Sequence, residues 1–179
     1  MPEAEFTLLG DALWLDFVNT AFGRTVPPPD QLPDAASYDR WTAALHLRPD
    51  ARPFGDVQRV RAVLIELAEV LAGGQPPPAP AITRINELLR HSSGAEQLTR
   101  VGGAWQIQFA AEHAPVALIA VARSAAATLA DPLLIVRQCA GADCSLFFTD
   151  DSLTQGRSCC STETCGRTAR VERRRGLLR

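Results

Sequence analysis

Apolar side chains recur every three or four residues in five stretches of the chain, which places them on one face of an α-helix. The clearest stretch runs from Asp56 to Leu71, with Asp56 as a candidate N-cap and Gly73-Gly74 at its end. A shorter helix is expected within residues 6–22, where Asp11 is a candidate cap. The remaining helices are predicted over residues 37–47, 81–91 and 115–129, the last with Pro115 in its first turn.

Three other segments have the alternating or β-branched pattern of strands. Two runs in QLTRVGGAWQIQF flank Gly102-Gly103, and two glycines between strand-like runs predict a β-hairpin. Residues 133–138 and 145–149 are short β-prone runs on either side of the first two cysteines. The pattern predicts an α+β protein: a mostly helical N-terminal domain (residues 1–135) with a small antiparallel sheet, then a small module (residues 136–179).

Charge is distributed unevenly between these two parts. Residues 1–138 hold 11 Arg and 15 Asp or Glu, a net charge of −4, whereas residues 139–179 hold 7 Arg and 5 Asp or Glu, a net charge of +2. Residues 157–179 alone carry 7 Arg against 2 Glu, a net charge of +5. A basic tail on an acidic body points to an anionic partner for the tail, although charge alone favours a solvated surface helix.

All five cysteines lie in the last 41 residues, in the pattern C139-x4-C144-x15-C160-x4-C165 with Cys159 next to Cys160. Two close pairs joined by a longer arm are typical of a tetrahedral zinc site, in which each pair lies on a tight knuckle. The pattern predicts one structural Zn²⁺, which would stabilise a module too small to fold on its own. An iron–sulfur cluster is the alternative, since four cysteines can hold either.

Cys160 is preferred over Cys159 as a ligand because it makes both knuckles x4. Cys159 is then a small packed residue or a redox-reactive thiol beside the site. Four thiolates on Zn²⁺ leave a net charge of −2, which Arg157 and Arg167 are placed in the sequence to offset.

A basic segment, CGRTARVERRRG, follows Cys165 directly. On a helix, Arg167, Arg170 and Arg174 share one face and Arg173 and Arg175 flank it. Arginine pairs with phosphates and with guanine edges, so the segment is a candidate nucleic-acid element. One such short helix would bind weakly, and a homodimer or a second contact would be needed for specificity.

These residues resemble a known bacterial family. The tail, RQCAGADCSLFFTDDS followed by GRSCCSTETCGRTARVERRR, is similar to the CGNR-type zinc finger, a treble-clef-like or knuckle-like module with a basic C-terminal helix. The body resembles the ABATE domain, through LDFVNT at residues 15–20 and YDRW at residues 38–41. The resemblance covers essentially the whole chain, although CGRT stands where the family signature has CGNR.

The resemblance implies a stress-linked transcription regulator that binds DNA through the finger and senses a small ligand through the N-terminal domain. It also implies that Cys139, Cys144, Cys160 and Cys165 are the ligands, and that Cys159 packs where the family tends to have tryptophan. Two alternatives remain: a structural-zinc protein whose tail binds a protein or RNA partner, and a thiol redox sensor acting through Cys159 and Cys160.

The body offers one weak candidate ligand site, formed by Asp16, Asn19 and Arg40. A buried polar network that fixes helix packing is the preferred interpretation of these groups. No P-loop, dinucleotide fingerprint or nucleophile elbow is present, so no enzyme activity is expected. The N-terminus lacks the features of a signal peptide and no apolar run is long enough to span a membrane, so a cytoplasmic protein without membrane contact is expected.

Overall fold

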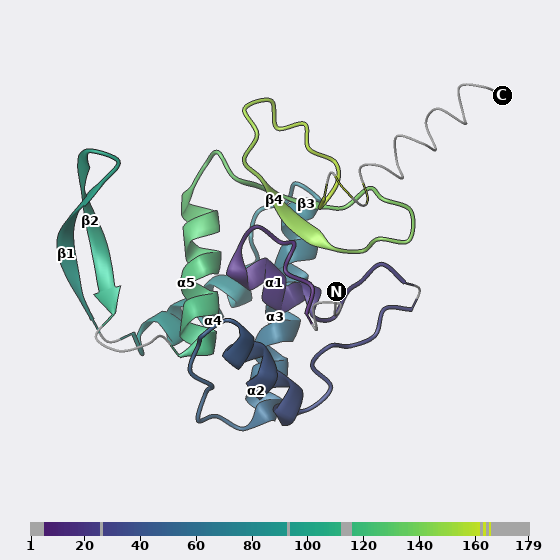
Figure 1. Cartoon of the computed structure of the whole chain (residues 1–179), viewed down its shortest axis with the longest axis horizontal. Coiled ribbons are helices and arrows are strands. Elements are labelled where there is room, and N and C mark those ends of the chain that lie inside the picture. Colours follow the sequence, from purple (N-terminus) through teal and green to yellow (C-terminus); the bar gives the residue numbers. More distant parts are fainter. Residues whose placement is uncertain are drawn as a thin grey trace.

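The helices of the computed structural model surround a short central helix. The structure describes residues 6–25, 27–92, 94–111, 116–161, 163 and 165. Helix α1 (Leu13–Asn19) packs against α3 (Phe54–Ala72) and α5 (Ala117–Ala130), and α4 (Ala79–Leu89) packs against α3 and α5 (Figure 1). Helix α2 (Ala35–Ala44) joins this group through its aromatic side chains, because Trp41 lies 5.3 Å from Phe17 between ring centroids. No helix among the described residues could span a membrane.

The main core lies around α1. Trp14, Phe17 and Trp41 are completely buried, and the indole Nε1 of Trp14 donates to Thr128 Oγ1 of α5 at 3.0 Å. Aromatic side chains of this size dominate the energetics of a core, and a buried indole N–H usually finds a hydrogen-bond partner, as that of Trp14 does. The periodic apolar stripe predicted for α3 is buried at Val57, Val60, Leu64 and Leu67.

Two predicted helix caps are wrong. Helix α1 begins after Ala12, with no side-chain cap, and Asp11 is held at φ 59° one residue earlier. Helix α3 begins at Phe54, two residues before Asp56, with Pro53 at its N-cap position, so Asp56 lies inside the first turn and pairs with Arg59. Helix α2 has a true capping box, in which Asp34 accepts from the backbone of Ser37 and the Ser37 hydroxyl accepts from Asp34 N–H.

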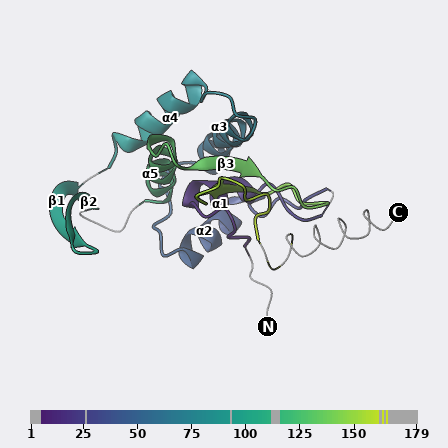
Figure 2. The same ribbon diagram turned by 90° about the horizontal axis from the view of Figure 1, so that it is seen from above.

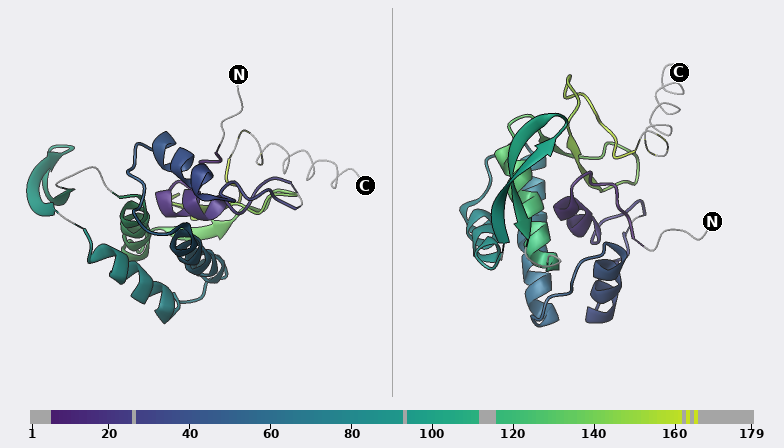
Figure 3. Two further views of the ribbon diagram at one scale, coloured as in Figure 1. Left: turned by 90° about the horizontal axis from the view of Figure 1, so that it is seen from below. Right: turned by 60° about the vertical axis from the view of Figure 1, so that its left-hand side comes forward.

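The predicted hairpin is confirmed as β1 (Gly94–Val101) paired antiparallel with β2 (Ala104–Ala111). Gly102 and Gly103 both have positive φ, 57° and 89°, which suits a two-residue hairpin turn. The hairpin extends away from the helices, as Figures 1 and 3 show from different sides.

A second antiparallel pair is formed by β3 (Ile135–Gln138) and β4 (Phe147–Asp150), and α5 lies between this pair and the β1–β2 hairpin (Figure 2). Strand β3 packs on α3 and β4 on α1. Side chains alternate along the second strand, so Phe147 enters the main core while Leu146 and Phe148 join a second cluster with the cysteines. Of the two phenylalanines, only Phe148 therefore packs beside the cysteines.

Candidate metal centre

Residues in and around α1 bind β4 and the residues just before it, which follow the first cysteine knuckle. The side-chain amide of Asn19 donates to the carbonyl of Phe147 and accepts from its N–H, both at 2.8 Å. On either side of this contact, Ser145 N–H donates to Gly23 O and Thr149 N–H donates to Gly10 O, each at 3.0 Å. Every second backbone N–H on this edge of the strand is thus bound by the N-terminal region, and β3 pairs with the opposite edge.

The four cysteines converge next to this strand. The Sγ atoms of Cys139, Cys144, Cys160 and Cys165 all lie within 4.8 Å of one another. The distances from Cys160 Sγ to Cys144 Sγ and Cys165 Sγ are 3.8 and 3.7 Å. A tetrahedral zinc ion with Zn–S bonds of about 2.3 Å has S···S edges of roughly 3.8 Å, so these thiols fit zinc.

Backbone contacts set the knuckle geometry. Ala140 N–H donates to Ser158 O at 2.8 Å and so joins the two knuckles. A Cβ on Gly141 would lie 3.1 Å from Cys165 Cβ and 3.2 Å from its Sγ, which is tighter than ordinary van der Waals contact, so glycine favours this close approach of the first knuckle to the fourth thiol. The N–H groups of Gly141 and Cys160 point at Cys139 Sγ from 3.4 and 3.3 Å.

Acid–base properties of the cluster show why it requires a cation. The pKa of Cys144 falls to about 5, chiefly because Cys160 donates a hydrogen bond to it. The pKa of Cys165 rises to about 11, through burial and then through the Cys144 thiolate. The pKa of Cys160 is also raised, by its hydrogen bond to Cys144 and by burial. One thiolate therefore suppresses the next, and a bound Zn²⁺ supplies the positive charge that lets all four ionise.

Arg24 supplies a positive charge that the sequence analysis missed. It follows α1, and its guanidinium lies 4.0 Å from Cys160 Sγ. Burial lowers the pKa of Arg24, but the hydrogen bond to Cys160 and the charges of Cys165, Cys160 and Cys144 outweigh it, so the pKa is raised. No local pattern could have identified this contact, because 136 residues separate Arg24 from Cys160.

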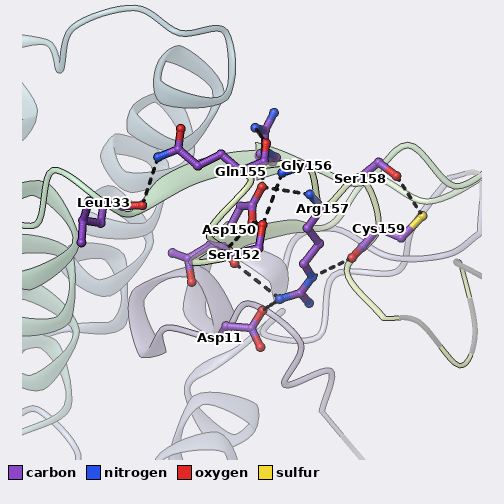
Figure 4. A network of polar contacts seen from close by, with 11 residues as sticks. Asp11, Leu133, Asp150, Ser152, Gln155, Gly156, Arg157, Ser158 and Cys159 are labelled. Atoms are coloured by element: carbon purple, nitrogen blue, oxygen red, sulfur yellow. Dashed lines mark hydrogen bonds and ion pairs between the residues drawn. The ribbon is translucent and has the colours of Figure 1, made fainter.

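Arg157 was expected to offset the thiolates but binds backbone instead (Figure 4). Its Nε and Nη2 donate to the carbonyls of Cys159 and Cys160 at 2.9 and 2.6 Å, and Nη1 pairs with the Asp11 carboxylate at 2.5 Å. The guanidinium also lies 4.6 Å from the centre of the Phe148 ring. Arg157 thereby connects the second knuckle to Asp11, which lies two residues before the start of α1. Arg167, the other expected counter-charge, lies outside the described residues.

Asp150 anchors the loop between the knuckles. It is fully buried, and its carboxylate accepts from Arg137 Nε at 2.9 Å, from the Ser152 hydroxyl at 2.6 Å and from Arg157 N–H at 3.0 Å (Figure 4). Burial raises its pKa, but the hydrogen bonds from Ser152, Arg137 and Arg157 more than compensate, so the pKa lies below its usual value. The segment that follows β4 is thus held by the charged side chain of Asp150.

Cys159 lies beside the metal set without belonging to it. Its side chain is buried, and its Sγ lies 3.8 Å from the Ser158 hydroxyl. The structure thus groups Cys160, rather than Cys159, with the other three thiols.

The three weak candidate ligand residues each have contacts of their own. Asn19 binds Phe147, and the Asp16 carboxylate accepts from Gly10 N–H at 2.8 Å. Burial raises the pKa of Asp16 to about 6. Arg40 is exposed on α2, where its charge contributes to the lowered pKa of Asp34 after the hydrogen bonds from Ser37. A ligand role for these three residues stays a prediction.

The arginines predicted to bind nucleic acid lie outside the described residues. These are Arg167, Arg170, Arg173, Arg174 and Arg175. Their position in the chain, immediately after Cys165, is what connects them to the metal centre.

A basic hollow lies at α4, away from the cysteines. It has a volume of about 310 Å³ and is lined by Arg52, Arg84, Glu87, Leu88, Arg90 and His91. Arg84 pairs with Glu87 at 2.9 Å, and among the described residues no acidic partner is found for Arg52 or Arg90. The hollow therefore carries an excess of positive charge over a buried leucine.

Comparison with known proteins gives two matches that together span most of the chain. The family model ABATE, described as "Putative stress-induced transcription regulator", matches residues 11–132. The model of the CGNR zinc finger matches residues 136–176. Neither is a model of an enzyme family, and a search of curated proteins found no match. Together with the four converging thiols, the second match identifies a zinc finger positioned to hold one zinc ion.

Proposed function

The chain belongs to the ABATE family, described as stress-induced transcription regulators, and contains a CGNR zinc finger, and we propose that it is a cytoplasmic, zinc-dependent regulator that binds DNA. The finger and the arginine-rich segment 167–175 contact DNA, and the N-terminal domain responds to a small ligand. The proposal includes a homodimer, which would double the DNA contacts, and assigns no catalytic step to the chain.

One structural observation carries the proposal: the finger is built onto α1 rather than linked by a flexible tether. Asn19, Gly23 and Gly10 bind alternate residues of the strand between Cys144 and Asp150. Arg24 reaches Cys160 from the same segment. A shift of α1 caused by a ligand therefore has a direct path to the metal ligands, and through Cys165 to the basic segment.

The zinc ion orders the finger, and the chain's own arginines supply the DNA contacts. Five arginines in residues 167–175 can each neutralise one phosphate. Full use of them would make the logarithm of affinity fall with the logarithm of salt concentration with a slope of about −4.5. Affinity for duplex DNA should therefore drop steeply with salt, whatever part of it is sequence-specific.

The test is fluorescence anisotropy of a labelled duplex, titrated with the zinc-loaded full chain at several salt concentrations. Arg170→Ala plus Arg174→Ala should weaken binding and make the salt slope shallower by roughly 2. The matched control, Arg59→Ala plus Arg100→Ala, removes two arginines from α3 and the hairpin and should leave both quantities unchanged. Equal behaviour of the two double variants would remove the basic segment from the mechanism. Retained zinc with no affinity for duplex DNA would favour an RNA or protein partner.

For the sensed ligand, the basic hollow at α4 favours a small anion, such as a carboxylate or phosphate. Its volume is at the lower end of the range for small-molecule sites, and two of its arginines lack an acidic partner among the described residues. Isothermal titration with inorganic phosphate and with citrate should give saturable binding that Arg84→Gln weakens and Arg59→Gln does not. Loss of binding in Arg40→Ala instead would support the site predicted from Asp16, Asn19 and Arg40.

A further inference from the structure

The β1–β2 hairpin has one apolar and one polar face. Its register pairs Leu98 with Ile107 and Arg100 with Trp105, so Leu98, Trp105 and Ile107 lie on the same face. We name these three residues the hairpin apolar face. Residues one position along each strand point the other way, and on that side lie the polar Gln97, Thr99 and Gln106.

The hairpin apolar face is open to solvent. Leu98 and Trp105 are 65% exposed and Ile107 is 70% exposed. In the part of the chain that the structure describes, extensive contacts of β1 and β2 are only with each other. Trp14 and Trp41, by contrast, are completely buried in the helical core.

Such an arrangement is unfavourable for a chain on its own. A two-stranded hairpin is at best marginally stable in water, and its stability comes from packing one face against another layer. At the exposures above, the three side chains leave roughly 400 Å² of apolar surface open, the size of a patch that is commonly an interaction site. By the register, Arg100 shares this face with the three apolar side chains, whereas the opposite face carries Gln97, Thr99 and Gln106 as well as Val101.

We propose that the hairpin apolar face packs against the same face of a second copy of this chain, about a twofold axis. Two such hairpins make a four-stranded, two-layer packing in which each face is the complement of the other. The nearby charge of Arg100 does not block this contact, because Arg100 Nε is directed to the carbonyl of Gly103 at the turn.

The surface area that the two hairpins bury indicates how strong the dimer is. The two faces together bury roughly 800 Å², below the size of stable interfaces and within the range of weak, reversible ones. The dimer should therefore form in the micromolar range and depend on concentration. Helix α5 lies between the hairpin and the β3–β4 pair (Figures 1 and 2), so a contact through the hairpin does not cover that pair.

This inference specifies the homodimer of the proposed function, and its test contains no DNA, so either can fail without the other. Sedimentation equilibrium of the zinc-loaded full chain, from low to high micromolar concentration, should show a monomer–dimer equilibrium. Trp105→Gln plus Ile107→Thr should raise the dissociation constant at least ten-fold. Gln106→Thr changes the polar face of the same strand and should match the unmodified chain.

Fluorescence tests the same contact without a substitution that could unfold the hairpin. Trp105 is the one exposed tryptophan of the three, so its emission should shift to shorter wavelength as concentration rises. A monomer at every concentration would overturn the proposal. A dimer that persists in the double variant and leaves the emission unshifted would place the contact elsewhere and overturn it as well. A monomer that co-sediments with phosphatidylcholine vesicles would replace the second copy by a membrane surface.

Discussion

Replacing Asn19 by alanine should destabilise the fold and the zinc finger together. Asn19 is completely buried, and its amide forms two hydrogen bonds of 2.8 Å with the backbone of Phe147. The alanine variant leaves one buried N–H and one buried carbonyl without partners, at about 1–3 kcal/mol each. We expect a loss of about 3–5 kcal/mol, a large part of the 5–15 kcal/mol typical of a domain.

Urea denaturation followed by far-UV circular dichroism measures this loss as a lower midpoint with an unchanged m-value. Competition with a chromogenic chelator should show faster release of zinc, because Phe147 lies on the strand that follows Cys144. Asn86→Ala is the matched control, since Asn86 is exposed on α4, and it should change stability by less than about 0.5 kcal/mol. If the two alanine variants had equal midpoints, the Asn19 contact would not couple the finger to α1.

Three further predictions concern charge and metal. Asp16→Asn should flatten the pH dependence of stability. The pKa of Asp16 is about 6 in the folded state, above the usual 3.8, so the folded state binds the proton more tightly than the unfolded state does. The stability of the unmodified protein therefore falls as pH rises from about 4 to 6. At pH 7 the variant should be more stable by about 1–3 kcal/mol in urea titrations, and an unchanged pH profile would contradict the buried carboxylate. Arg157→Lys keeps the charge but loses the fork that binds the Cys159 and Cys160 carbonyls, so zinc affinity should drop roughly 10–100-fold by chelator competition, with Arg59→Lys as control. Zinc removal should unfold the finger but keep most of the helical circular dichroism signal at 222 nm, because the main core contains no cysteine. Collapse of that signal would show that the metal supports the whole fold.

The zinc site and most elements could be predicted from short-range patterns. Cysteine spacing identified the four thiols, because each knuckle is a local turn whose geometry limits the gap between its two ligands. Helical periodicity located α3 and α5, and Gly102-Gly103 located the hairpin turn, since both signals repeat within one element. Helix starts were less well predicted: the sequence alone could not show that Pro53 would begin α3 ahead of Asp56.

Contacts between distant segments were decided only by the tertiary structure. Asn19 looked like half of a ligand site from its sequence, yet it binds Phe147, 128 residues away. Asp11 looked like a helix cap, yet it pairs with Arg157, 146 residues away. Such partners share no periodicity with each other. They meet because the apolar residues of α1 and β4 are buried in one core, and polar groups carried there must then be satisfied.

The sequence by itself therefore determined that the chain has a helical body, an amphipathic hairpin and a four-cysteine finger. The tertiary structure decided that the finger is held by α1 and that Arg24, from the N-terminal part, faces the thiolates. It also decided that the apolar side of the hairpin has no cover within the described residues. The physical reason is the sequence distance over which each signal acts. Hydrophobic periodicity and ligand spacing act over a few residues, whereas burial and hydrogen-bond satisfaction depend on which surfaces the whole chain brings together.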